Sequence, residues 1–215
     1  MLQKSLVIFS LLTSFFVTGL PTLAQKPRIK PKTPQNSIIK TKKLDLSTII
    51  LNAKDLPEGF TLYNQEKKGD GYGFFWQRKK EQSMELIIGH AGILNASVAD
   101  MKKQITPENA PIIKQSIMQV FDQIDFAEQL GKKAKIKVKT ISSEELTLPE
   151  DIGDVAAGKT LLLDVEGVQT HVDQVVFIRG NVMTMLIKIH PDNDPDVVPI
   201  LSLIRTIDSR LKQAF

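Results

Sequence analysis

The chain has 215 residues, a net charge of +4 and no cysteine. The missing cysteine excludes disulfides, thiolate metal sites, a cysteine nucleophile and a lipid-modified N-terminal cysteine. Residues 1–43 hold eight of the 28 basic residues and none of the 24 acidic ones, so the remainder is net acidic. A nucleic-acid-binding domain is therefore disfavoured, because its positive charge should lie on the folded body.

Residues 1–24 are typical of a secretory signal peptide. Lys4 supplies a positive start, an almost uncharged apolar run follows from Leu6 to Leu20, and small residues at Thr22-Leu23-Ala24 suit a signal peptidase. Cleavage after Ala24 predicts an extracytoplasmic protein, in a periplasm, a thylakoid lumen or the medium.

The alternative interpretation of the N-terminus is a retained membrane anchor. The apolar run is shorter than the ~20 residues that a spanning helix needs, and Gly19 and Pro21 interrupt it, so cleavage is favoured. No later segment is long and apolar enough to span a bilayer.

Residues 25–43 are expected to form a disordered basic linker, because proline alternates with lysine and arginine and apolar residues are few. One hypothesis is contact with an anionic lipid, cell-wall polymer or acidic partner through Lys26, Arg28, Lys30 and Lys32. The alternative is a spacer whose charges only keep it solvated.

Residues 44–215 are predicted to form one domain. A short helix or turn at 44–51 precedes strands at 60–64, 72–78 and 84–90, with hairpin-turn residues at 67–71. Ser97 and Asp100 have capping-box spacing at the start of a helix that ends at Thr106-Pro107. A second helix carries an apolar stripe from Ile113 to Ala127 and ends near Gly131.

The second half of the domain is expected to return to strands, at 133–140, 160–165, 172–179 and 182–189. Gly180-Asn181 between the last two is a strong signal for a two-residue hairpin. A final helix begins near Pro195, with Asp194 as its N-cap.

This order predicts an α+β fold, in which an antiparallel β-sheet packs against helices in the sequence β-hairpins, two helices, β-hairpins and a C-terminal helix. Asp55–Phe60 and Asp173–Val182 resemble segments of small secreted bacterial domains of the PsbP/Mog1-like sandwich type. The resemblance implies an antiparallel sheet flanked by helices and a non-catalytic accessory or assembly role. It carries over no functional residue.

Gly153–Thr160 matches the phosphate-binding P-loop pattern. A P-loop needs a strand before it and a helix after it, whereas a turn precedes this segment and a strand is expected to follow it. We therefore interpret the match as accidental, in a loop that enters a strand.

Two further patterns resemble metal-binding sites, but neither has the full set of residues that such a site needs. Asp192–Asp196 alternates carboxylates, but it lacks the glycine and glutamate of a calcium-binding EF-hand loop, so a helix cap is favoured. His90, His171 and His190 fall at strand ends and could converge on a zinc or acid–base site, although no paired histidine motif exists. We predict no metal or cofactor.

Two side-chain rows have alternative interpretations. Tyr72, Phe74 and Trp76 share a strand face and are predicted to be core, or else an exposed stacking platform. The alternating residues Lys133, Lys135, Lys137 and Lys139 could contact an anionic surface or protect an edge strand from aggregation.

Converging polar residues on predicted loops are lacking, which favours a secreted, non-enzymatic accessory or binding domain, such as an assembly or envelope-associated factor. Its partner is expected to be an unidentified protein or an anionic envelope component, and not nucleic acid. Two alternatives remain open. A cell-wall or ester hydrolase would need a deep polar pocket with a carboxylate and a histidine. An apolar-ligand carrier would need a large apolar pocket between sheet and helices.

Overall fold

The computed structural model describes residues 44–80, 83–123, 127–128, 131–132, 136–192, 194 and 198–215. The predicted signal peptide and the whole of the predicted linker lie outside the described residues. None of the described helices is both long and apolar enough to cross a membrane.

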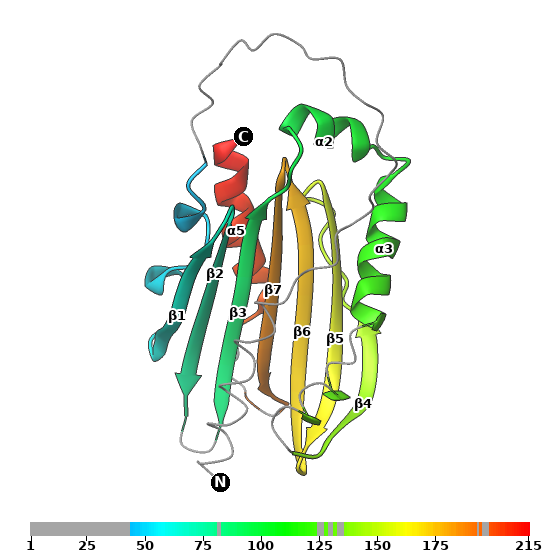
Figure 1. Cartoon of the computed structure of the whole chain (residues 1–215). Helices are drawn as coiled ribbons and strands as arrows, with labels where there is room; N and C mark the ends of the chain where they lie inside the picture. Colours follow the sequence, from blue (N-terminus) through cyan, green and yellow to red (C-terminus); the bar gives the residue numbers. More distant parts are fainter. Residues whose placement is uncertain are drawn as a thin grey trace. The chain divides into compact units, whose positions relative to one another are not determined.

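The described part of the chain is built on a seven-stranded sheet in the order β1-β2-β3-β7-β6-β5-β4, and every neighbouring pair is antiparallel (Figure 1). The strands are β1 (Phe60–Lys68), β2 (Gly71–Lys79), β3 (Met84–Ile93), β4 (Val138–Glu145), β5 (Val155–Val165), β6 (Val168–Arg179) and β7 (Val182–Pro191). The helices with described bounds are η1 (Leu46–Thr48), η2 (Ala53–Asp55), α2 (Val98–Gln104), α3 (Ala110–Gln123) and α5 (Ile200–Ala214).

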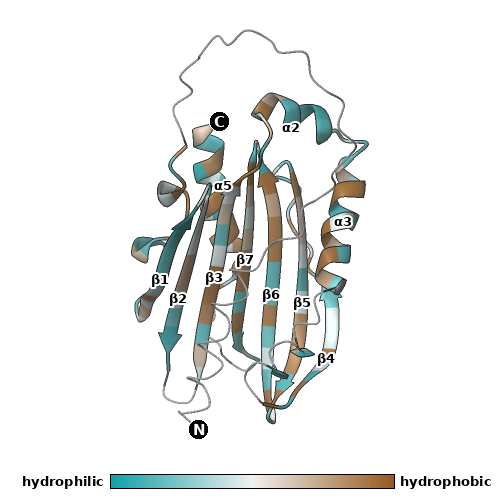
Figure 2. Ribbon diagram, viewed as in Figure 1, coloured by the Kyte–Doolittle hydropathy of each residue, from teal (hydrophilic) through white to brown (hydrophobic). Residues whose placement is uncertain are grey.

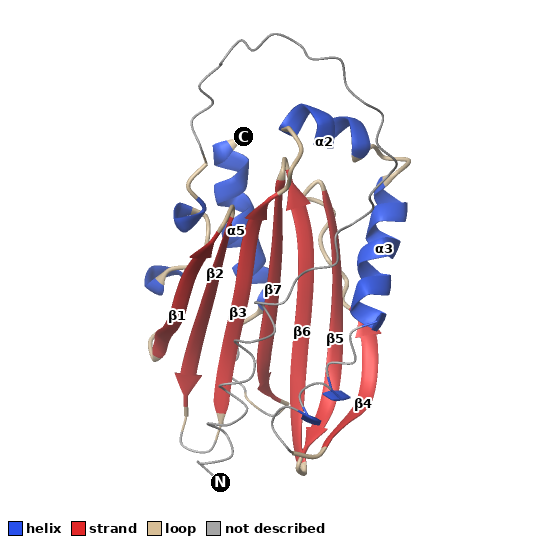
Figure 3. Cartoon of the chain, in the orientation of Figure 1, coloured by secondary structure: helices blue, strands red, loops and turns tan. Residues whose placement is uncertain are grey.

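The α+β prediction is wrong for the domain as a whole, because the molecule is mainly sheet and its strands outweigh its helices (Figure 3). The element pattern also differs from the predicted one. Two short 3-10 helices, η1 and η2, open the domain. Several strands extend beyond the predicted ranges, chiefly because edge strands need no apolar alternation and therefore leave a weak signal.

The edge strand β4 illustrates this error. A strand was expected at 133–140, but β4 begins at Val138 and runs through Ser142, Ser143 and Glu144 to Glu145. Those polar residues are mostly exposed, because β4 has only β5 as a neighbour. The other edge, β1, is equally exposed and hydrophilic, in contrast to the more apolar central strands (Figure 2).

The two faces of the sheet carry different helices. Val176 and Ile178 of β6 pack in the apolar clusters that hold α3 and α2. Since side chains alternate along a strand, Phe177 and Arg179 point to the opposite face. Arg179 binds Asp208 of α5 there, with its Nε 2.8 Å from Oδ1. Helix α5 therefore covers one face, and α2 and α3 lie on the other.

The start of the last helix was predicted wrongly. Helix α5 begins at Ile200 with Pro199 as its N-cap residue, and no side chain caps it. Asp194 instead pairs with Lys80, while Pro195 lies outside the described residues. The helical spacing of the apolar residues does identify the buried face of this helix, since Ile200, Ile204 and Ile207 are buried.

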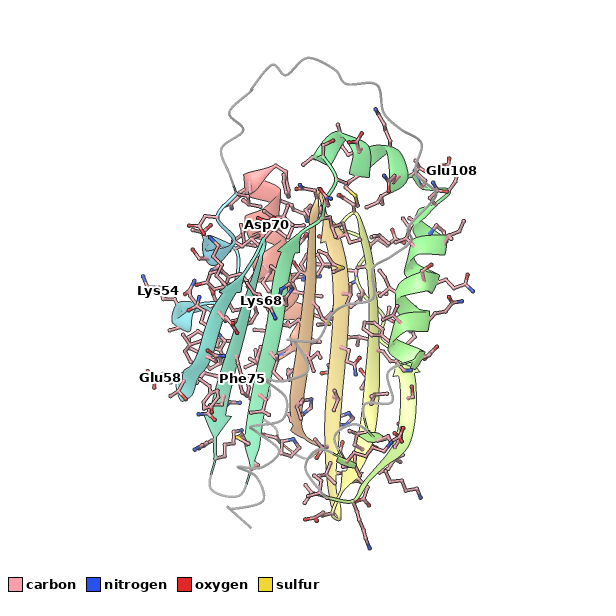
Figure 4. The ribbon with its side chains drawn as sticks, in the orientation of Figure 1. Lys54, Glu58, Lys68, Asp70, Phe75 and Glu108 are labelled. Carbon is pink, nitrogen blue, oxygen red and sulfur yellow. The ribbon has the colours of Figure 1, made fainter. Side chains whose placement is uncertain are left out.

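The hairpin predicted at Gly180-Asn181 is confirmed, because β6 and β7 pair directly on either side of it and Gly180 has a positive φ of 60°. Both edge strands contain a register shift, at Tyr63 in β1 and at Ile141 in β4. Tyr63 packs edge-on against Phe75 of β2, with ring centroids 5.3 Å apart; Figure 4 labels Phe75. Such bulges interrupt an edge and discourage sheet-to-sheet association.

Candidate functional site

A cavity of about 560 Å³, widely open to solvent, lies beside the start of β4. Its apolar wall includes Ala127, Ile136 and Val138, and Gly131 and Gly167 add backbone without side chains. The remaining lining residues are charged: Glu128, Lys137, Lys139, Asp164 and Glu166. The volume is in the range of small-molecule sites, roughly 300–1,000 Å³.

Backbone contacts fix the walls of this cavity. The turn between β5 and β6 has positive φ at both Glu166 (52°) and Gly167 (89°), as a two-residue type I′ hairpin turn requires. The Glu166 N–H donates to the Lys137 carbonyl oxygen at 3.0 Å, which ties this turn to the chain entering β4. The Gly167 N–H donates to Asp164 Oδ1 at 2.7 Å.

Gly131 is a helical residue that lies close to the start of β4. A Cβ at this position would lie 3.1 Å from the Ile136 carbonyl oxygen and 3.8 Å from Val138. A larger residue would therefore push the two walls apart, and the close approach depends on glycine.

The predicted anionic-contact residues divide into two groups. Lys26, Arg28, Lys30, Lys32, Lys133 and Lys135 lie outside the described residues, so the structure does not place them. Lys137 and Lys139 are described, and both line the cavity. Only Lys139 of the lysine row lies within a described strand, and that strand is a sheet edge.

A second group of polar residues is buried on the α5 face. Arg78 and Glu85 form an ion pair at 2.5 Å, and Glu85 is fully buried. The other Glu85 oxygen accepts from the Val198 N–H at 3.2 Å, just before α5. Nearby, Lys188 Nζ lies 3.5 Å from Asp173 Oδ2, and the Thr160 hydroxyl donates to Asp173 Oδ1 at 2.8 Å.

Burial sets the acid–base properties of this cluster. Burial lowers the pKa of the Lys188 amino group, and the charges of Asp173 and Glu85 oppose that shift only in part. Burial acts to raise the pKa of Asp173, but His190 and the Thr160 hydroxyl outweigh it, so the pKa of Asp173 is lowered. The Asp173 carboxyl group and the Lys188 amino group therefore face each other in a place largely shielded from water.

The three histidines do not converge on one site. His171 and His190 are stacked, with ring centroids 5.2 Å apart, and His171 Nε2 lies 2.5 Å from Asp192 Oδ1. His90 pairs in register with Met185, which packs on the α3 side, so it faces away from them. Among the described residues no group of histidine and acidic side chains could hold a metal ion.

The segment that matches the P-loop pattern lacks the helix that a P-loop needs after it, and its placement in a loop was predicted wrongly. Val155 to Thr160 are part of the long strand β5, with no helix after them. Lys159 is not a loop residue; its amino group lies 2.5 Å from Asp122 of α3. In the aromatic row, Phe74 and Trp76 are buried core residues, as predicted.

The sequence analysis assembled neither the cavity nor the buried ion pairs, although it had singled out Lys137 and Lys139 of the cavity lining. The cavity combines residues far apart in the chain, from Ala127 to Gly167, and no local spacing links them. The buried ions left a usable signal, because Glu85 and Lys188 interrupt otherwise apolar central strands. A charge in such a strand indicates a buried partner.

No protein-family model matches the sequence, and the search of curated proteins found no match. Two solved structures show a distant likeness. A StAR-related lipid transfer protein from Xanthomonas axonopodis (fragment 25–204) has 13% identity and a TM-score of 0.23, over 73% of this chain and 100% of that one. Human StAR-related lipid transfer protein 5 has 9% identity and a TM-score of 0.20, over 73% and 86%. Likeness at these scores supports no argument about this chain.

Proposed function

We propose that this protein binds a small apolar or amphipathic molecule without transforming it. The observation that carries the proposal is the cavity of about 560 Å³, with Ala127, Ile136 and Val138 in its wall. Apolar surface of this kind favours transfer of a hydrocarbon group out of water, by roughly 25 cal/mol for each Å² buried. The charged residues that also line the cavity could contact a polar group at one end of such a ligand.

A binding role fits the polar residues better than a hydrolytic one. His171, His190 and Asp173 lie together on the α5 face, and none of them lines the cavity. Hydrolysis would need a carboxylate, a histidine and the substrate in the same pocket. We retain secretion as part of the proposal, because a carrier outside the cytoplasm suits the predicted signal peptide.

A filling substitution tests this function. The full chain is titrated with a fluorescent fatty-acid analogue, and the same titration is repeated with Val138→Trp and Ile141→Trp. Val138 lines the cavity, whereas Ile141, on the same strand, is 47% exposed and lies outside it. We expect at least tenfold weaker binding for Val138→Trp and unchanged binding for Ile141→Trp.

Circular dichroism and thermal melting of both variants separate loss of binding from loss of fold. Equal binding by the wild type and a folded Val138→Trp would contradict the proposed site. Absence of any binding by the wild-type chain would contradict the proposed function itself.

A further inference from the structure

We infer that the ligand is a long, unbranched hydrocarbon chain, which leaves the cavity and lies across the sheet along Val138, Val165 and Val168. This inference rests on the proposed function, because it extends the same site and assigns the shape of the molecule that the site is proposed to hold. The cavity is widely open to solvent, so a chain that starts inside it can continue outside.

The three valines form one row across three neighbouring strands. Val138 of β4 pairs with Val165 of β5, and Val165 pairs with Val168 of β6 across the β5–β6 turn. Residues directly opposite each other in an antiparallel pair point to the same face, with Cβ atoms roughly 4.5–5.5 Å apart. The row is therefore continuous and spans two strand spacings, about 10 Å.

The row starts at the cavity and lies on the same face of the sheet as α3. Val138 lines the cavity, and its Cβ lies 3.8 Å from the position that a Cβ on Gly131 would take. Ala157 of β5 packs in the apolar cluster of α3, and the alternation of side chains along β5 puts Val165 on that face as well. The apolar wall of the cavity therefore continues into the valine row.

The neighbouring row of the sheet is polar and points to the opposite face. Lys139 pairs with Asp164, and Asp164 pairs with Gln169. Each of these residues is next in the chain to a valine of the row, so its side chain leaves the strand on the other side. The sheet therefore separates a hydrocarbon chain on the valine row from these polar groups.

The accessible apolar surface is one residue wide, which fits a single chain. Val138 and Val165 are half-buried, and Val168 is 53% exposed. Leu163, the next residue of β5 on this face, is fully buried. On the other side of the row, β5 and β6 end at the Glu166-Gly167 turn. A long chain can cover such a stripe, whereas a compact ring system with the same number of carbon atoms cannot.

The test varies the length and shape of the hydrocarbon while the head group stays a carboxylate. Calorimetric titration of the full chain uses octanoate, undecanoate, tetradecanoate and adamantane carboxylate, which has as many carbon atoms as undecanoate. We expect affinity to rise at least about tenfold from octanoate to tetradecanoate, because each added methylene group leaves water. Undecanoate should bind more tightly than adamantane carboxylate.

Substitution at the outer end of the row locates the effect. Val168→Asn should lose most of the gain from octanoate to tetradecanoate and keep its affinity for octanoate, because only the longer chain reaches this position. Val168→Leu should keep the gain. Ile141→Asn is the matched control, since Ile141 is 47% exposed on β4 and belongs neither to the row nor to the cavity lining. It should behave as wild type, and thermal melting checks that all three variants are folded.

The failures of the two proposals are distinguishable. Equal affinity for octanoate and tetradecanoate would overturn the extended chain and leave the proposed function standing, as would adamantane carboxylate that binds as tightly as undecanoate. A gain that persists in folded Val168→Asn, or a loss of octanoate affinity in that variant, would overturn the extended chain as well. If none of the four carboxylates binds, the proposed function fails together with this inference.

Discussion

At the scale of single residues, the buried lysine Lys188 depends on its neighbour Asp173 for a counter-charge. Lys188 is 2% exposed, and its nearest described anion is Asp173, 3.5 Å away. A buried ammonium without a counter-ion is costly, whereas an intact buried pair contributes little net stability. The pair therefore matters mainly through what its loss would leave behind.

Asp173→Asn is expected to lower the free energy of unfolding by about 3 kcal/mol, because Lys188 would stay buried without its counter-ion. Urea unfolding at neutral pH measures this. Asp122→Asn is the matched control, since the Asp122 side chain is 64% exposed in its pair with Lys159. That change should cost no more than about 1 kcal/mol. Equal losses in both variants would refute the argument from burial.

His90 gives a prediction about pH. Burial lowers the pKa of His90 below its ordinary value of 6.5. As the pH falls, the unfolded chain therefore takes up the proton before the folded chain does, and stability decreases through that window. Above the ordinary pKa the imidazole is neutral in both states and no stability is lost.

The variant His90→Gln should remove this part of the acid sensitivity. Urea midpoints are compared between about pH 7.5 and about pH 5.5 for the wild type and the variant. The wild type should lose more stability over that interval. A variant that loses as much as the wild type would show that His90 does not contribute.

At the scale of strands, a missing side chain in β3 makes room for an aromatic ring in β2. Gly89 lies opposite Phe74 in the register, and a Cβ on Gly89 would lie 2.1 Å from the Phe74 ring. The glycine and the ring are therefore complementary, and Phe74 is buried as a result.

Gly89→Ala should destabilise the fold by roughly 1–3 kcal/mol, because the ring must shift within a packed core. Gly73→Ala is the matched control, since its Cβ would meet only backbone oxygens at an ordinary 3.9 Å. We expect that change to stay within about 1 kcal/mol of the wild type. Thermal melting of both variants decides between them, and an unaffected Gly89→Ala would refute the overlap.

The elements that could be predicted are those with strong local signals. The Gly180-Asn181 hairpin and the apolar face of α5 follow from turn residues and periodicity. The edges could not be predicted, because β4 continues through Ser142 to Glu145 with no apolar pattern. The start of α5 was misplaced because Asp194, which suits a cap, pairs with Lys80 instead.

At the scale of the whole molecule, both the large sheet and the cavity are formed by contacts between segments that are distant in the sequence. β3 pairs with β7 across nearly half of the chain, and the cavity joins Ala127 to Gly167. Of the predicted contact residues, Lys137 and Lys139 lie at that cavity, but the sequence linked them to an extended anionic surface and not to a pocket.

The central claim is that one amphiphile occupies the cavity beside β4, and hydrogen–deuterium exchange of the full chain with and without oleate tests it most directly. We predict slower exchange at residues 136–139 and 164–167, whose backbone forms the walls, with little change in β1. Unchanged exchange in these two segments at saturating oleate, or protection confined to other strands, would contradict the claim.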